Sequence, residues 1–128
     1  MFDLQHVTIL LAEDDLGHAC LIEKNLRRSN IVNQIIHVSD GQQAVDFLLR
    51  QGEFEGRPHP ENLLVMLDLN MPVLDGYQVL ERIKNEESTK RIPIIVLTTT
   101  DDRREVTRCY DLGCNVYVTK PVDYEQFT

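Results

Sequence analysis

The sequence predicts an α/β protein built on a doubly wound, five-stranded parallel sheet. Short apolar runs alternate with segments of helical periodicity five times along the chain, and the chain has no internal sequence repeat. The central run, Leu63 to Leu67, is continuously apolar and is bounded by turn residues, which is typical of a strand buried on both faces. Parallel strands need crossover connections, so we expect helices on both faces of the sheet.

The strands are expected where short apolar runs meet turn residues. They are predicted at Val7 to Ala12, Gln34 to Val38, Leu63 to Leu67, Ile94 to Leu97 and Val116 to Val118. Between the second helix and the third strand, the polar segment Gln51 to Asn62 holds two Gly and two Pro and is expected to be an exposed loop. It is longer than the ~2–6 residues usual for such loops.

Helices are predicted where apolar residues recur every three or four positions. They are expected at Leu16 to Ser29, Gln42 to Arg50, Tyr77 to Glu87, and from a cap at Asp101 or Asp102 through Leu112. We expect Asp15 to cap the first helix and Gly113 to end the fourth. Asp123 would cap a fifth helix, but five residues follow it, so this helix is expected to be truncated or missing. Either the chain is a piece of a longer polypeptide or a partner covers that face.

Size and charge narrow the class of protein. With 128 residues the chain fits one domain, 1–128, and no apolar run approaches the ~20 residues of a membrane span. The N-terminus lacks the basic stretch of a secretory signal, and we expect a cytoplasmic protein. A formal net charge of −8 and an isoelectric point near 4.9 argue against nucleic acid as a partner.

Three cysteines, Cys20, Cys109 and Cys114, have no metal-binding spacing and leave one unpaired in any disulfide scheme. We expect free thiols in a reducing compartment, and the alternative is a redox role for the pair Cys109 and Cys114. The four histidines are scattered along the sequence, and the pattern assigns them no role.

Polar side chains stand at the carboxyl ends of four predicted strands, where ligands bind in open α/β sheets. Glu13 and Asp14 follow the first strand, Asp68 the third, Thr98 the fourth and Lys120 the fifth. Converging carboxylates repel each other, and a hard cation such as Mg²⁺ relieves that repulsion. An aspartate beside a metal ion and a lysine can attack phosphorus and form an acyl phosphate.

Each of these residues also has an ordinary structural explanation. An acid after a strand is often a helix cap, as expected for Asp15, and a lone Asp68 would be a turn residue. Thr98 would be a capped or solvated hydroxyl, and Lys120 a surface lysine. Together, four strand ends that present acids, a hydroxyl and a lysine favour a reactive site. For that role we expect Asp68 to lie near Asp14 and Lys120 and to be open to solvent.

With these motifs the chain resembles the receiver domain of two-component response regulators from Val7 to about Asp123. The motifs are ILLAEDD, DLNMPVLDG, PIIVLTTT and YVTKP, in this order. The resemblance implies a flavodoxin-like sheet with strand order 2-1-3-4-5. It also implies a signalling switch and not an enzyme with turnover.

The resemblance assigns the acids to phosphoryl transfer. Asp68 matches the phosphoryl acceptor and, with Asp14, a direct Mg²⁺ ligand. The backbone carbonyl of Asn70 matches a third ligand. Glu13 matches an acid that often acts through water, and it stands where the family more commonly has Asp.

The remaining motif residues match the switch. Thr98 and Lys120 correspond to residues that grip the phosphoryl group. Tyr117 corresponds to the aromatic residue that swings inward when the threonine moves. Pro121 corresponds to a proline that usually follows a cis peptide bond.

The resemblance also implies partners. A sensor histidine kinase would donate the phosphoryl group, and an output protein that the sequence does not name would read the switch; a homodimer is a further option. The long loop and ILLAEDD look like small stand-alone regulators that serve bacterial phytochromes, which would make the kinase a phytochrome-type protein.

The sequence leaves two alternative functions open and excludes dinucleotide binding. A metal-dependent phosphatase would also form an aspartyl phosphate, but it carries a second Asp where this chain has Asn70, which cannot serve as the general acid. A receiver-like scaffold would bind partners without phosphorylation. Dinucleotide binding is excluded because acids, and no Gly-rich turn, follow the first strand.

Overall fold

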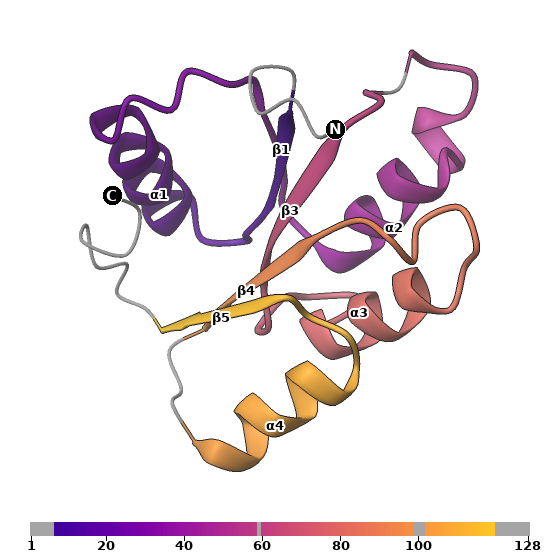
Figure 1. The fold of residues 1–128 in the computed structure, drawn as a ribbon. Coiled ribbons are helices and arrows are strands. Elements are labelled where there is room, and N and C mark those ends of the chain that lie inside the picture. Colours follow the sequence, from indigo (N-terminus) through magenta and orange to yellow (C-terminus); the bar gives the residue numbers. More distant parts are fainter. Residues whose placement is uncertain (1–6, 59, 99–101, 120–128) are drawn as a thin grey trace.

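Five parallel strands form the centre of the molecule, in the order β2-β1-β3-β4-β5 (Figure 1). The structure is a computed structural model that describes residues 7–58, 60–98 and 102–119. The strands are β1 (Thr8–Ala12), β2 (Ile35–Val38), β3 (Leu63–Asp68), β4 (Ile94–Thr98) and β5 (Val116–Thr119). The predicted fold class and strand order are confirmed.

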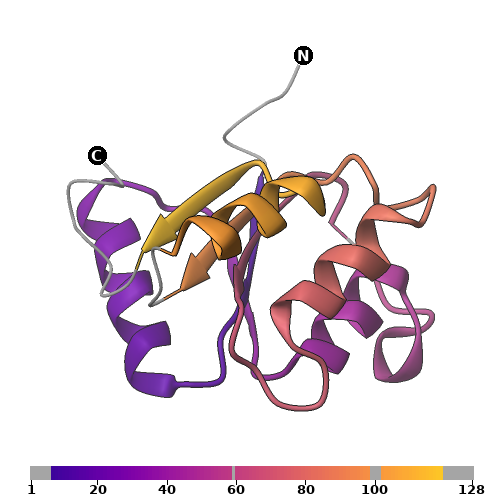
Figure 2. The same ribbon diagram turned by 90° about the horizontal axis from the view of Figure 1, so that it is seen from below.

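Helices cover both faces of this sheet (Figures 1 and 2). The described residues form α1 (Leu16–Arg28), α2 (Gly41–Leu49), α3 (Gly76–Lys84) and α4 (Arg103–Asp111). Helix α1 lies on one face, and α2 and α3 lie side by side on the other. The fifth helix expected at Asp123 falls outside the described residues. Within them, no helix is both long and apolar enough to pass through a lipid bilayer.

The strands alternate their side chains between two hydrophobic cores. In β3, Val65 and Leu67 belong to the larger core under α2 and α3, whereas Met66 belongs to the smaller core under α1. All three side chains are almost completely buried. Burial of an aliphatic side chain contributes about 1.5–3 kcal/mol to the free energy of unfolding. The middle of the sheet is therefore stable and supports the residues at its carboxyl edge.

Aspartate caps begin α1 and α4, as the sequence predicts, and another begins α3. The Asp15 carboxylate accepts a hydrogen bond from the His18 N–H at 3.1 Å, and this confirms it as the α1 cap. Asp75 and Gln78 form a reciprocal capping box at α3. Of the two candidates for α4, Asp102 is the cap. Gly113 follows α4 with a φ of +106°, a left-handed conformation that glycine adopts without a steric penalty.

The predicted helix Tyr77 to Glu87 is wrong at its end, because α3 stops at Lys84. The Thr89 hydroxyl donates to the Ile83 carbonyl at 2.7 Å, and the Lys84 ammonium donates to the carbonyls of Lys90 and Ile92. Side chains thus satisfy carbonyl groups around the helix end, and the chain turns back toward β4.

The polar segment Gln51 to Asn62 is also more ordered than the sequence predicts. It contains a short 3-10 helix, η2 (Gly52–Phe54), which brings Phe54 back to the body of the protein. The Phe54 ring packs edge-on against Phe47 of α2 with 5.2 Å between the ring centres. Phe54 therefore anchors a loop whose polar composition predicts full exposure.

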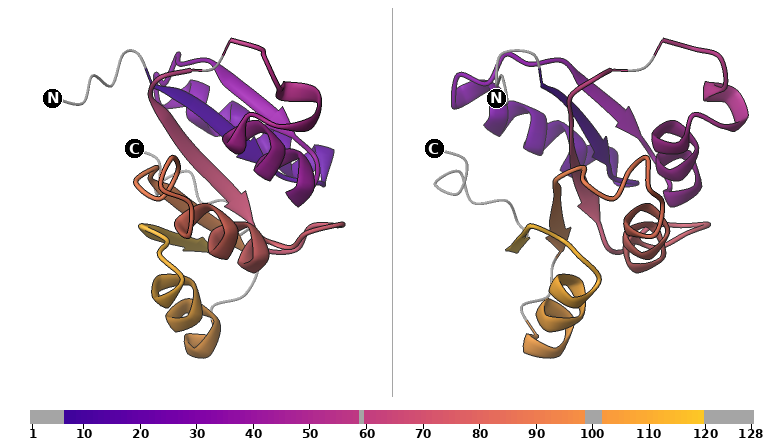
Figure 3. Two further views of the ribbon diagram at one scale, coloured as in Figure 1. Left: turned by 90° about the vertical axis from the view of Figure 1, so that its right-hand side faces the viewer. Right: turned by 45° about the vertical axis from the view of Figure 1, so that its right-hand side comes forward.

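The strand order places a switch point next to the centre of the sheet. The chain passes from β1 to the edge strand β2 and then returns to the other side of β1 as β3. The carboxyl ends of β1 and β3 are therefore neighbours, with Ala12 opposite Leu67. Helix α4 lies beside β5, at the edge of the sheet opposite β2 (Figure 3). Ligand sites of open α/β sheets form at such a switch point.

Candidate functional site

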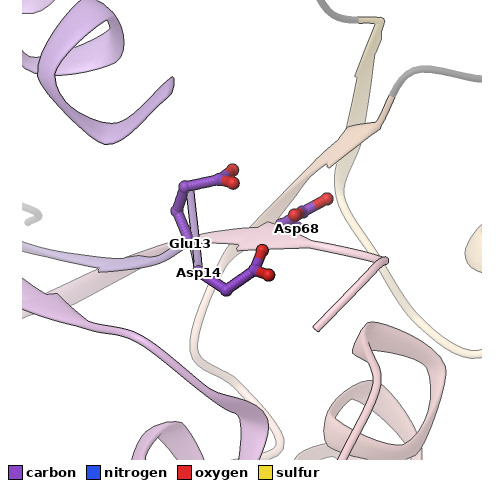
Figure 4. Close-up of side chains that lie close together, drawn as sticks. All are labelled: Glu13, Asp14 and Asp68. Atoms are coloured by element: carbon purple, nitrogen blue, oxygen red, sulfur yellow. The ribbon is translucent and has the colours of Figure 1, made fainter. Parts of the chain in front are cut away.

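Three carboxylates gather at the switch point (Figure 4). Glu13 and Asp14 follow the end of β1, and Asp68 is the last residue of β3. Each offers an oxygen atom, and these oxygens lie within 4.8 Å of one another. The described residues contain no other such cluster of His, Cys, Asp or Glu. The structure thus brings together the three acids that the sequence singles out.

The three acids differ in their access to solvent. Glu13 and Asp68 are buried, with Asp68 only 4% exposed, whereas Asp14 is exposed. The expectation of an open Asp68 was therefore wrong for that residue itself. It ends the central strand β3, which has β1 on one side and β4 on the other. The cluster reaches solvent through Asp14.

The backbone after Asp68 folds closely over its carboxylate. The Asn70 N–H donates to Asp68 Oδ1 at 3.2 Å, and the Gly76 N–H donates to the Leu69 carbonyl at 2.9 Å. A Cβ atom on Gly76 would lie 2.6 Å from the Asp68 carbonyl oxygen. Only glycine therefore lets α3 begin this close to the acid-bearing strand end.

Glu13 has hydrogen-bonding neighbours on several sides. Its Oε1 accepts the Asp15 N–H at 3.2 Å and lies 3.7 Å from His18 Nδ1. Its backbone carbonyl accepts a hydrogen bond from His37 Nε2 at 2.7 Å. The sequence assigned neither histidine a role, since the contacts depend on how α1 and β2 pack around the end of β1.

Thr98 and Tyr117 occupy the neighbouring strands. Thr98 is the last residue of β4 and is buried at the same edge of the sheet, where Asp68 pairs with Leu97. Tyr117 pairs with Val96 and is half-buried against the larger core. Lys120 and Pro121 follow the last described residue of β5, Thr119, and lie outside the described residues. The roles of all four residues, and that of the Asn70 carbonyl, stay predictions.

The donor set suits a hard divalent cation. Carboxylate oxygens are the side-chain ligands that Mg²⁺ prefers, and Mg²⁺ commonly keeps several waters and one or two carboxylates. The exposed Asp14 gives such an ion, and a phosphoryl group, an approach from solvent. The buried Asp68 and Glu13 give it fixed partners.

The fold and the site together define a class of protein, namely a doubly wound receiver-type domain with an acidic cluster at its switch point. Residues 9–128 match the response regulator receiver domain. The chain belongs to this family, whose members act in two-component signal transduction.

Individual relatives agree with this assignment. Response regulator Rcp1 of Synechocystis sp. is 43% identical over 112 residues, which are 88% of this chain and 75% of Rcp1. The Mn²⁺-bound structure of Rcp1 superposes with a TM-score of 0.81 and covers 94% of this chain and 85% of its own. A receiver domain from Rhodospirillum rubrum is 50% identical, with a TM-score of 0.79 and coverage of 94% and 84%. The phosphorylated cyanobacterial phytochrome response regulator RcpA is 36% identical, with a TM-score of 0.82 and coverage of 95% and 86%.

Proposed function

We propose that this chain accepts a phosphoryl group on Asp68, with Mg²⁺ bound by the acidic cluster, and thereby switches a protein-binding surface. The observation that carries the proposal is the convergence of Glu13, Asp14 and Asp68 within 4.8 Å at the switch point. The Mn²⁺ in the Rcp1 structure and the phosphorylation of RcpA support it by similarity.

The three acids would have different roles in binding the cation. Asp14 and Asp68 would bind the cation directly, with the Asn70 carbonyl as a third ligand and Glu13 acting through water. The bound cation supplies positive charge that offsets the phosphoryl oxygens. An Asp68 carboxylate oxygen attacks phosphorus, the bond from phosphorus to the donor nitrogen or oxygen breaks, and the donor leaves with that electron pair.

Thr98 and Lys120 would then contact the new phosphoryl oxygens. Thr98 ends β4 beside Asp68, so its movement toward phosphate would alter the backbone that leads to α4. Tyr117 on β5 would move inward and change the surface that α4 and β5 share. The chain then works as a switch between two states and not as an enzyme that turns over an external substrate.

We further propose a sensor histidine kinase of the phytochrome type as the donor, acting in the cytoplasm. RcpA supports this choice, since it is a phytochrome response regulator. An output protein binds the surface that changes on phosphorylation. A second copy of the chain is an alternative partner for the same surface.

Phosphorylation by a small donor tests the proposal. The parent, treated with acetyl phosphate and Mg²⁺, is expected to gain the mass of one phosphoryl group, and EDTA should prevent the gain. Asp68→Asn should remain unmodified because an amide is a poor nucleophile. Asp75→Asn is the matched control, because Asn caps a helix as well as Asp does. Intact-protein mass spectrometry reads all four conditions.

Two results would count against this function. Modification of Asp68→Asn to the parent level would remove Asp68 as the acceptor. A parent that stays unmodified while Mg²⁺ is present, and that binds no Mg²⁺ at millimolar concentration, would favour the scaffold alternative.

A further inference from the structure

Three consecutive peptide units carry the two acids at the end of β1, and each is held by a hydrogen bond. The Glu13 N–H donates to the Val38 carbonyl at 3.1 Å. The Glu13 carbonyl accepts from His37 Nε2 at 2.7 Å. The Asp15 N–H donates to Glu13 Oε1 at 3.2 Å. The backbone dihedral angles of Glu13 and Asp14 are therefore fixed from both sides.

The middle bond differs from the other two. It holds the peptide unit between Glu13 and Asp14, and its donor is a side chain 24 residues further along the chain. His37 lies in the edge strand β2, opposite Leu11 of β1. Since a carbonyl oxygen can only accept, Nε2 of the His37 ring carries the proton in this contact. Rotation of that peptide unit would turn the Asp14 side chain away from Asp68.

We propose that His37 is a positioning residue of the acidic cluster. It touches neither the cation nor the phosphoryl group; it holds the Glu13–Asp14 peptide unit so that the Asp14 carboxylate faces Asp68. This role rests on the proposed function, because it matters only if the cluster binds a cation. The His37 imidazole holds this peptide unit, and the peptide unit in turn orients Asp14, a predicted direct ligand of the cation.

The location of Asp14 makes the role physically reasonable. Asp14 is the exposed member of the cluster, so packing does little to restrict it, whereas Glu13 and Asp68 are buried. An exposed ligand depends on its backbone for orientation. Residues that orient metal ligands through hydrogen bonds typically change metal affinity about 10–100-fold when they are replaced.

Four proteins separate this role from a general effect on folding. His37→Leu removes the donor, and His37→Gln restores an N–H at a similar distance from the backbone. Gln34→Leu is the matched control, because Gln34 is also exposed and lies just before β2, at its opposite end. Each variant and the parent are titrated with Mn²⁺, and the free ion is measured by electron paramagnetic resonance. The free energy of unfolding is measured without metal.

We expect His37→Leu to bind Mn²⁺ about tenfold more weakly than the parent, with His37→Gln and Gln34→Leu within about twofold of it. In the metal-free protein, the amide proton of Asp15, whose N–H donates to Glu13 Oε1, should exchange faster in His37→Leu alone.

Parent-like Mn²⁺ affinity in His37→Leu would overturn the positioning role and leave the proposed function intact. Equal weakening in His37→Leu and His37→Gln would also overturn it, since the donor would then be irrelevant. A parent that binds no Mn²⁺ would overturn the proposed function itself, and the positioning role with it.

Discussion

Val73 holds an unusual backbone conformation in the loop between Asp68 and α3. Its φ is +68°, a left-handed value, although its side chain is β-branched and 72% exposed. Such a conformation costs about 1–3 kcal/mol. The Leu74 N–H donates to the Pro72 carbonyl and so closes a γ-turn centred on Val73, and the Gly76 N–H donates to the Leu69 carbonyl. Strain is thus stored next to the predicted acceptor.

Val73→Asn should relieve part of this strain, because Asn adopts a positive φ at a lower cost than a β-branched residue does. We expect the free energy of unfolding to rise by about 1 kcal/mol in urea titrations. Val32→Asn is the control: Val32 is 84% exposed and is not among the positive-φ residues, so its replacement should change stability by less than about 0.5 kcal/mol. Equal effects in both variants would mean that Val73 is not strained.

The identities of the acids and their order could be predicted from the sequence, whereas the contacts around them could not. Asp14 and Asp68 end apolar runs, and parallel pairing makes such ends neighbours. The burial of Asp68 and the contact from His37 to Glu13 depend on how side chains pack at the carboxyl edge, which the strand order alone does not determine. A single His in a short strand carries no periodic signal of that contact.

At the scale of elements, few side chains of the residues that the structure describes hold α4 to the sheet. Cys109 is its one buried residue, and Arg108 stacks over the Tyr77 ring of α3 at 3.8 Å. Burial raises the pKa of the Cys109 thiol to about 11, and burial also raises the pKa of the Cys114 thiol. Both are therefore protonated at neutral pH and act as small apolar side chains.

These thiols should react slowly with Ellman's reagent at pH 8, because the thiolate is the nucleophile. We expect one fast thiol in the native parent, the exposed Cys20, and none in Cys20→Ser. All three should react in the denatured protein. A second fast thiol in the native parent would revive the redox alternative for Cys109 and Cys114.

The same pKa shift predicts how stability depends on pH. The native state keeps the Cys109 proton above pH 9, where the unfolded state loses it, so stability from this group is complete below about pH 9 and is lost toward pH 11. The free energy of unfolding should therefore fall more steeply over this range in the parent than in Cys109→Ala.

Sequence patterns predict the buried strands better than they predict where helices end or how loops pack. The apolar runs of β1, β3 and β4 predict strands well because burial on both faces demands continuous apolar residues. The end of α3 depends on Thr89 and Lys84, whose bonds reach across a turn. The packing of Phe54 on Phe47 depends on tertiary contact that loop composition does not encode.

At the scale of the whole molecule, two buried cores hold a rigid sheet whose carboxyl edge carries the acids. The strand order brings together residues that are more than fifty positions apart in the sequence, from Asp14 to Asp68. Helix α4, beside β5, makes few contacts with the other described residues. A buried carboxyl edge beside a helix with few contacts to the described residues is compatible with the proposed switch, because binding energy at one must move the other.

The central claim is that Asp68 accepts a phosphoryl group and that this reaction requires a bound metal ion. The most direct measurement treats the parent with acetyl phosphate and Mg²⁺, reduces the acyl phosphate with sodium borohydride, and locates the resulting homoserine by peptide mass spectrometry. We expect homoserine at position 68 alone, and none when EDTA replaces Mg²⁺. Homoserine at another aspartate, or equal yield without metal, would contradict the account.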